Sequence, residues 1–261
     1  MTLSLYTQAD TAIHRLHPVV KLVAMLGLFT TVFLTDAAQL LAPLILICFA
    51  VATWAKSLTV FWRLRTLFVL VFLMTFAVWT LFFQSGTPLA KWGPIEISEA
   101  GLIYALGMGL KLVGFMAVGV LFLATAKVEE FAYALTRIGV PFKLGFTMTL
   151  AFRLVPAFVE ASMTVVQAQR CRGFNFDEGN VLQRIRRYVP VIVPVFIGAL
   201  RRADGMAMAL EARGFQSERR RTSLEEYRFR ATDGLGLVLV LGVTLLYVVF
   251  WRLNVGQVGG A

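Results

Sequence analysis

The chain has 261 residues, of which 58% are hydrophobic and 22 are Phe, and its mean hydropathy is +0.75. A soluble domain of this length is far less apolar, so the composition excludes that class and predicts a polytopic membrane protein. The formal net charge is +10, and most of this surplus lies in one region, between Lys127 and Arg230.

Five stretches are candidate membrane-spanning helices, judged against the roughly 20 apolar residues that a bilayer crossing needs. They are Val19 to Leu34, Ala37 to Ala55, Thr66 to Phe83, Gly101 to Ala126 and Gly234 to Trp251. The first is short and begins among basic residues, as a signal peptide does, but no A-x-A-like cleavage site follows it before the second apolar run begins. We therefore predict an all-α membrane protein of about five transmembrane helices.

The basic residues of the short loops predict the orientation, because such residues tend to stay on the cytoplasmic side. Arg15 and Lys21 stand at the start of the first span, and Lys56, Arg63 and Arg65 separate the second from the third. The loops at 35–36 and 84–100 together hold a single Lys and no Arg. We predict a cytoplasmic N-terminus and an external C-terminus.

The same rule places the region from Lys127 to Arg230 in the cytoplasm. It holds 17 of the 25 Lys and Arg residues but only 10 of the 15 Asp and Glu residues. Anionic lipid headgroups attract such juxtamembrane charge, and this explains runs without regular spacing, such as Arg219 to Arg221. Nucleic acid is not an expected partner, because the region is rich in Val, Phe, Met and Pro and contains no recognisable binding motif.

Two helices are predicted within this region. Leu144 to Arg172 has apolar residues at steps of three and four, which make one apolar face, and its opposite face is polar. It is too polar to be an expected span, and Pro156 should kink it. The second helix, Tyr188 to Arg213, has an apolar first half of about 12 residues, too short for a sixth crossing.

Each of these two helices ends in the tripeptide Arg-Gly-Phe, as Arg172-Gly173-Phe174 and as Arg213-Gly214-Phe215. For one copy a structural explanation suffices, since Gly favours the position after a helix C-terminus and a cation there complements the helix dipole. Two copies, each preceded by a small residue (Cys171 and Ala212), favour a pair of similar docking tips. Arg can form a bidentate bond to a partner carboxylate, and Phe can fill a pocket beside it.

The chain resembles the transmembrane T component of energy-coupling factor (ECF) transporters over nearly its whole length. That family carries two short Ala-Arg-Gly motifs before its last membrane helix; Ala212-Arg213-Gly214 matches, and Cys171-Arg172-Gly173 matches with Cys in place of Ala. The stretches His14-Arg15-Leu16-His17-Pro18 and Arg153-Leu154-Val155-Pro156 are also similar, although an acidic residue is commoner at His17.

The resemblance implies a non-catalytic scaffold in a bacterial inner membrane. Its partners would be two cytoplasmic ATP-binding-cassette ATPases and a membrane S component that captures a vitamin or metal ion. The chain itself would bind no nucleotide, cofactor or metal, and it contains no G-x-x-x-x-G-K-[ST] loop. A membrane domain (1–126), a coupling region (127–232) and a last helix with the C-terminus (233–261) would follow in order. The resemblance assigns ATPase coupling to the two motifs with their flanking residues: Cys171, Arg172, Gly173, Phe174, Ala212, Arg213, Gly214 and Phe215.

Two other classes remain open. Asp204-Gly205 with Ala212-Arg213 partly resembles the core of the CDP-alcohol phosphotransferases, membrane enzymes acting on lipid phosphates, but the spacing is longer than in that family. A stand-alone secondary transporter is the other alternative. Its only hint is Lys111, an ionisable residue within the fourth predicted span. His14 and His17 could share a helix face, but two imidazoles alone bind zinc poorly.

Overall fold

The computed structural model describes residues 11–83, 88–92, 95–176, 180–215, 227 and 229–253. The chain divides into two compact units. The larger unit comprises Met1–Val140 and Tyr227–Ala261, and the smaller unit comprises Pro141–Glu226. The described elements are helical except for one hairpin, so the protein is an all-α polytopic membrane protein, as predicted.

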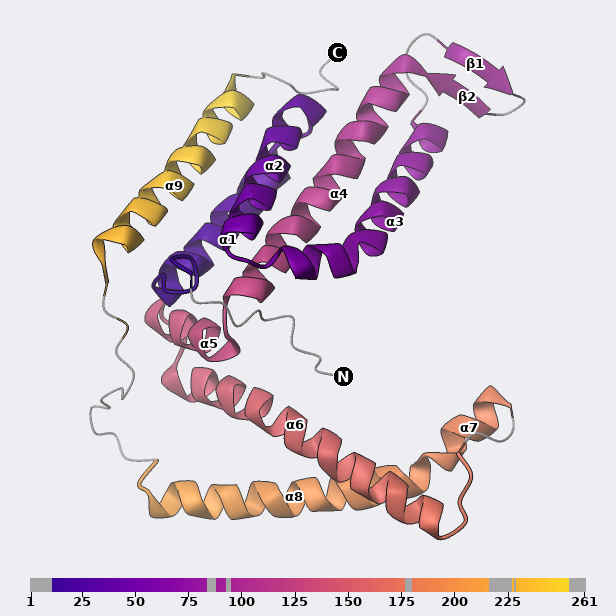
Figure 1. Cartoon of the computed structure of the whole chain (residues 1–261), viewed down its shortest axis with the longest axis vertical. Coiled ribbons are helices and arrows are strands. Elements are labelled where there is room, and N and C mark those ends of the chain that lie inside the picture. The colour runs from indigo at the N-terminus through magenta and orange to yellow at the C-terminus, as the bar shows by residue number, and fades with distance from the viewer. Residues whose placement is uncertain are drawn as a thin grey trace. The chain divides into compact units, whose positions relative to one another are not determined.

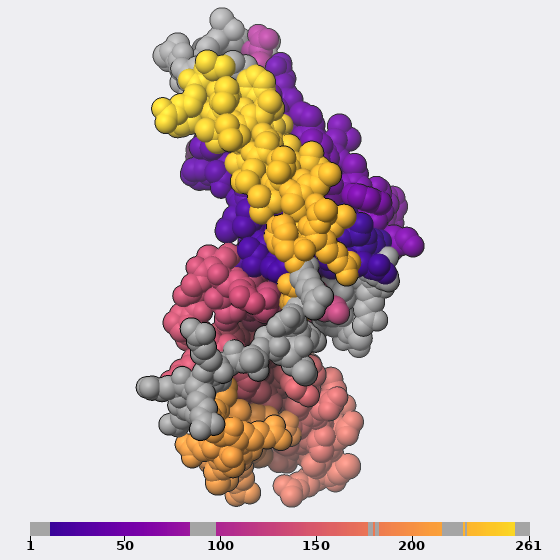
Figure 2. Space-filling model, turned by 90° about the vertical axis from the view of Figure 1, so that its left-hand side faces the viewer, coloured from indigo at the N-terminus to yellow at the C-terminus, as the bar shows by residue number. Residues whose placement is uncertain are grey.

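The larger unit contains the five predicted spans, all of them as helices (Figure 1). Its helices are α1 (Pro18–Leu34), α2 (Ala38–Trp54), α3 (Leu58–Phe82), α4 (Glu99–Thr125), α5 (Val128–Arg137) and α9 (Ala231–Arg252). Helix α4 packs against α1, α2 and α3, and α9 packs against α1. Figure 2 shows α9, in yellow, lying over the indigo N-terminal helices. The central position of α4 explains why so many of its residues are buried.

The helices differ in their capacity to cross a bilayer. Among the described helices, those long and apolar enough to cross a bilayer are α3, α4, α9 and α6 (Phe142–Cys171). Helices α1 and α2 have 17 residues each, which is about 26 Å at the rise of an α-helix, slightly less than the hydrocarbon thickness of a bilayer. The result for α6 differs from our expectation that it is too polar, because one window of 18 residues has a mean hydropathy of 1.4 and no more than two charged residues.

A β-hairpin precedes α4, where we expected only a loop. Strands β1 (Pro88–Trp92) and β2 (Ile95–Ser98) pair antiparallel, with Trp92 opposite Ile95. Ser98 ends β2 and also caps α4, because its Oγ accepts a hydrogen bond from the Gly101 N–H at 3.0 Å. The hairpin therefore leads directly into the first turn of the central helix.

The small residues of α4 allow close packing, which predicts an effect of enlarging one of them. A Cβ added at Gly107 would clash with the backbone carbonyl oxygen of Asp36, in the connection between α1 and α2. Backbone cannot rotate away as a side chain can, so Gly107→Ala should destabilise the protein by about 1–3 kcal/mol. At Gly119 the nearest atom would be Phe29 Cζ at 3.8 Å, an ordinary contact. Thermal unfolding in detergent should therefore show a loss for Gly107→Ala and none for the control Gly119→Ala.

The smaller unit consists of α6, α7 (Val181–Arg187) and α8 (Val189–Ala212), and α6 crosses α8 (Figure 1). Helix α6 continues through Pro156 without interruption. Of the described residues of this unit, only Gly145, Phe176 and Val191 are buried. The unit thus has almost no core of its own, and large apolar side chains such as Phe196 (61% exposed) remain accessible.

The boundary between the units differs from the predicted start of the coupling region at Lys127. Helix α5 packs against α1, so it belongs to the larger unit, and the smaller unit begins at Pro141. The contact includes a buried ion pair between Lys21 and Glu130, whose sequence positions are far apart. The return to the larger unit occurs at Tyr227, before the predicted last segment.

Candidate functional site

The two Arg-Gly-Phe tripeptides adopt the same backbone structure at the ends of α6 and α8. We call them the α6 tip (Cys171–Phe174) and the α8 tip (Ala212–Phe215). In each, the Arg is the C-cap and the following Gly has a positive φ, +82° at Gly173 and +71° at Gly214. Two segments 41 positions apart therefore present an Arg in the same local geometry.

The hydrogen bonds identify both ends as Schellman motifs. At the α6 tip, the Phe174 N–H donates to the Gln169 carbonyl at 3.0 Å and the Gly173 N–H to the Arg170 carbonyl at 2.9 Å. At the α8 tip, the Phe215 N–H donates to the Leu210 carbonyl at 2.9 Å and the Gly214 N–H to the Glu211 carbonyl at 2.8 Å. The motif satisfies helix carbonyls and leaves the Arg side chain free to point outward.

Both Arg side chains of the tips are exposed. Within the part of the chain that the structure describes, neither the Arg172 nor the Arg213 guanidinium has a hydrogen-bond or ion-pair partner. Cys171 and Ala212, which precede them, are also exposed and small. Each tip can thus offer a complete guanidinium fork to a carboxylate, with little steric obstruction from the neighbouring side chain.

The Phe rings of the tips pack on their own unit. Phe215 lies 4.6 Å from Phe146, between ring centroids, so the α8 tip contacts the beginning of α6. Phe174 lies 5.2 Å from Phe176, which is buried against Tyr188. Both Phe residues remain half-exposed. They therefore brace the tips, which lie at opposite ends of the crossed helices (Figure 1).

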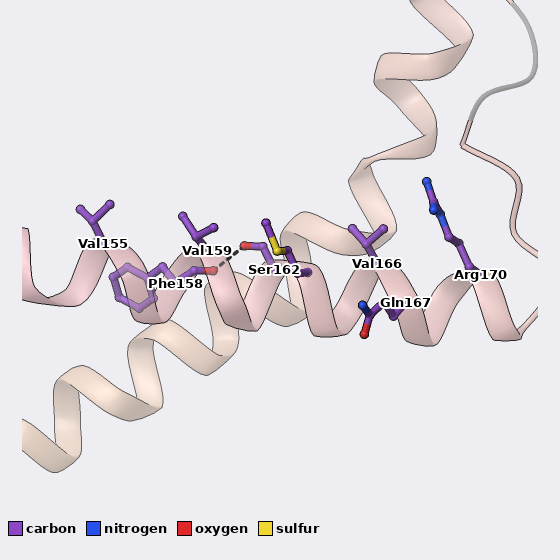
Figure 3. A pocket seen from close by; sticks show the side chains of 8 residues that line it. Val155, Phe158, Val159, Ser162, Val166, Gln167 and Arg170 are labelled. Atoms are coloured by element: carbon purple, nitrogen blue, oxygen red, sulfur yellow. Dashed lines mark hydrogen bonds between the residues drawn. The ribbon is translucent and has the colours of Figure 1, made fainter. Parts of the chain in front are cut away.

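An open groove of about 600 Å³ runs along α6 towards its tip (Figure 3). Its lining repeats at steps of three and four residues along one face of the helix: Val155, Phe158, Val159, Ser162, Met163, Val166, Gln167 and Arg170. The Ser162 hydroxyl donates to the Phe158 carbonyl at 2.7 Å, so this polar group is satisfied within the helix. The groove is apolar over most of its length and becomes polar only near the α6 tip.

The positive φ of the tip glycines predicts a conformational cost for any other residue there. Nothing lies within 4 Å of a Cβ added at Gly173 or Gly214, so the cost of Gly→Ala is backbone strain, about 1–2 kcal/mol. Gly205, in the middle of α8, has equally open surroundings and no positive φ. Gly205→Ala should instead stabilise its helix by about 0.5–1 kcal/mol.

Hydrogen exchange can measure this difference at the helix ends. In Gly173→Ala, the Phe174 amide should exchange about tenfold faster, because the bond to Gln169 opens more readily. Equal protection of Phe174 in Gly173→Ala and in the wild type would contradict this account of the tip.

The structure also places the other candidate residues. Lys111 forms an ion pair with Asp36, Nζ to Oδ1 at 2.6 Å, so this intramembrane cation has a structural partner. His17 caps α1, its Nδ1 accepting a hydrogen bond from the Val19 N–H at 3.2 Å.

No cluster of three or more metal-ligating side chains occurs among the described residues. Asp204 and Gly205 lie in mid-helix α8 and are exposed.

Sequence reasoning missed two buried carboxylates, Glu130 and Asp233. Each is less than a tenth exposed and lies near the beginning of α1. A signal for Asp233 existed, because an acidic residue in the first turn of a helix is favoured there. Glu130 has the same position in α5. The sequence pattern does not predict which distant residue either carboxylate binds.

Comparison with known proteins supports the resemblance. The family model of the cobalt transport protein CbiQ matches residues 9–224. The energy-coupling factor transporter transmembrane protein EcfT of Thermosediminibacter oceani is 32% identical over 243 residues, which cover 89% of this chain and 91% of that protein. The EcfT protein of Clostridium kluyveri is 30% identical, covering 96% and 98%. The EcfT protein of Limosilactobacillus fermentum is 28% identical, covering 94% and 95%.

These matches extend over both units and include both tips. The α6 and α8 tips lie within the residues that the family model covers, and the relatives match nearly from end to end. The predicted family is thereby confirmed: the chain belongs to the CbiQ family of cobalt transport proteins, together with the EcfT transmembrane components of energy-coupling factor transporters.

Proposed function

We propose that this chain is the energy-coupling scaffold of an ECF-type importer. In this role it binds two cytoplasmic ATP-binding-cassette ATPases through the α6 and α8 tips, and a membrane S component that captures the substrate. The observation that carries the proposal is the pair of tips, each built by the same Schellman motif and each presenting an exposed Arg. Two equivalent docking points suit two homologous partners.

The proposed mechanism is mechanical rather than catalytic. Nucleotide bound to the ATPases would shift the two tips, and the crossed helices α6 and α8 would carry this displacement along the smaller unit. Because a partner that contacts two states equally shifts no equilibrium, the ATPases must hold the tips differently in their two nucleotide states. The exposed apolar side chains of α6 and α8 are the surface we assign to the S component.

The distribution of basic residues supports a cytoplasmic N-terminus and an external C-terminus. Arg63 and Arg65 lie in the first turns of α3, at the same end of the larger unit as the beginnings of α1 and α9 (Figure 1). The chain also leaves this end towards the smaller unit after α5. By the positive-inside rule this end faces the cytoplasm, where the ATPases are.

Affinity purification of the tagged protein from its native membrane tests the proposal. We expect two ATP-binding-cassette ATPases and one small hydrophobic protein to co-purify in mild detergent, and the identity of the small protein should indicate the vitamin or metal ion that is transported. A chain that purifies alone and catalyses uptake after reconstitution would refute the scaffold and favour the secondary transporter. Exchange of phospholipid headgroups by the purified chain would instead favour the enzyme.

A further inference from the structure

The first turn of α1 and its cap contact α5, after which the chain leaves the larger unit, and the segment by which the chain returns. The chain leaves the larger unit just after α5, and it re-enters at Tyr227, shortly before α9. Figure 1 shows α5 and the beginnings of α1 and α9 on the same side of the larger unit. Both covalent connections to the smaller unit therefore join the larger unit near this place.

A buried ion pair joins α5 to α1. Lys21 Nζ lies 2.7 Å from Glu130 Oε2, and the two residues are 6% and 7% exposed. The same ammonium group donates to the carbonyl oxygens of His14 at 2.7 Å and Thr125 at 3.1 Å. All three donor positions of Lys21 are thus used, and they connect the segment before α1, the end of α4 and the first turn of α5.

Little chain remains between α5 and α6 to absorb movement. Helix α5 ends in a closed turn, in which the Val140 N–H donates to the Leu135 carbonyl at 3.1 Å. Pro141 follows at once and is the N-cap of α6. The residues between the two helices are therefore only those from 138 to 141.

One carboxylate joins α9 to the same turn of α1. Asp233 is 1% exposed, and its two oxygens accept two backbone hydrogen bonds. Oδ1 accepts from the His17 N–H at 2.7 Å, and Oδ2 accepts from the Arg230 N–H at 2.7 Å. Asp233 thus connects the residue that caps α1 with the residue that caps α9.

Aromatic rings surround His17 and complete the junction. The His17 ring lies 6.1 Å from Tyr133 of α5 and 5.6 Å from Phe229, and Tyr133 lies 4.9 Å from Tyr227, between centroids. Tyr227 and Phe229 belong to the returning connection, whereas Tyr133 belongs to α5, the last helix before the chain leaves the larger unit. The returning connection is therefore in contact with α5 as well as with the residue that caps α1.

We propose that this junction, formed by His17, Lys21, Glu130 and Asp233, delivers movement of the smaller unit to α1 and α9 together. Glu130 and Asp233 act as positioning residues: they hold α5 and α9 on the first turn of α1, so the three helices respond as one body. Without Asp233, the first turn of α1 loses its polar link to α9 and to Arg230 of the returning connection, so α1 receives less of the movement. The inference rests on the proposed function, since nucleotide-driven movement of the smaller unit is what the junction transmits.

Hydrogen–deuterium exchange of the purified complex with its ATPases tests this role. Exchange is compared between ADP and a non-hydrolysable ATP analogue, in peptides from the first turns of α1 and from α6. In the wild type, the exchange rates of the α1 peptides and of the α6 peptides should both differ between ADP and the ATP analogue. In Asp233→Asn, the change in α6 should persist, whereas the change in α1 should fall by about threefold or more, within the range that single residues contribute to coupling.

The control is Asp36→Asn, which removes a carboxylate from another ion pair of the larger unit, the one with Lys111 of α4. It should leave the nucleotide-dependent change in α1 as in the wild type. If Asp233→Asn does not assemble, the double variant Lys21→Met with Glu130→Leu removes the other link without leaving a buried charge.

The outcomes separate the two proposals. A wild-type complex whose α6 peptides do not respond to nucleotide would refute the proposed function. If α6 responds and Asp233→Asn transmits the change to α1 undiminished, the junction is refuted. A uniform rise of exchange in both nucleotide states, with an unchanged difference, would show a merely structural role and would also overturn the inference.

Discussion

Replacing Arg172 and Arg213 together by Ala should abolish stable association with the ATPases. Both guanidiniums are exposed, and they have no partner within the described chain, so each is available for a charge-assisted bond to a partner carboxylate. Truncating an Arg that anchors an interface costs about 2 kcal/mol or more. That cost corresponds to roughly a thirtyfold loss of affinity per tip, and the tips are separate enough for their losses to add.

The measurement is the affinity of the purified chain for its ATPases, for each single variant and for the double variant. Arg201→Ala with Arg202→Ala is the matched control, because it removes two exposed guanidiniums from α8 without touching a tip. Arg172→Lys should restore little, since an ammonium cannot form a bidentate bond. Undiminished association of the double tip variant would refute the docking role of both tips.

Replacing Glu130 by Gln should produce the largest loss of stability within the larger unit. The substitution leaves the Lys21 ammonium buried without its counter-charge, and breaking a buried pair in this way costs about 3–5 kcal/mol. The double variant Lys21→Met with Glu130→Leu removes both charges and keeps the volume, so it should recover most of this loss.

Thermal unfolding in detergent, followed by the loss of monodisperse protein, compares the three proteins. Asp36→Asn serves again as a control, because the Asp36 side chain is 39% exposed whereas that of Glu130 is 10% exposed. A Glu130→Gln protein as stable as the wild type would mean that the Lys21 ammonium is adequately solvated by the carbonyls of His14 and Thr125 alone.

Local sequence patterns were sufficient for most helices and for the tips. Each of the five predicted spans lies on a helix of the larger unit, and the helices predicted at 144–172 and 188–213 correspond closely to α6 and α8. The Schellman geometry at Gly173 and Gly214 also follows from local sequence, because few other residues adopt a positive φ after a helix. The role of the tips in docking remains a prediction.

Other features lay beyond local patterns. The hairpin before α4 was missed because its strands are only five and four residues long and lie in a segment that reads as a loop. The positive-inside rule grouped the residues of α5 with the coupling region, and only the structure reveals that α5 packs against α1. The charge of Glu130 is tolerated in this packed position because its carboxylate forms an ion pair with Lys21.

By itself, the sequence determined the membrane class, the helices and the paired tips, since hydropathy, helical periodicity and the demands of a helix end act over a few neighbouring residues. Only the tertiary structure decided which charges are partners. Lys21 pairs with Glu130 across 109 positions and Lys111 with Asp36 across 75, and the Asp233 carboxylate accepts from the backbone N–H of His17 across 216. A buried charge must find a counter-charge or hydrogen bonds, but which one it finds depends on the packing of distant helices.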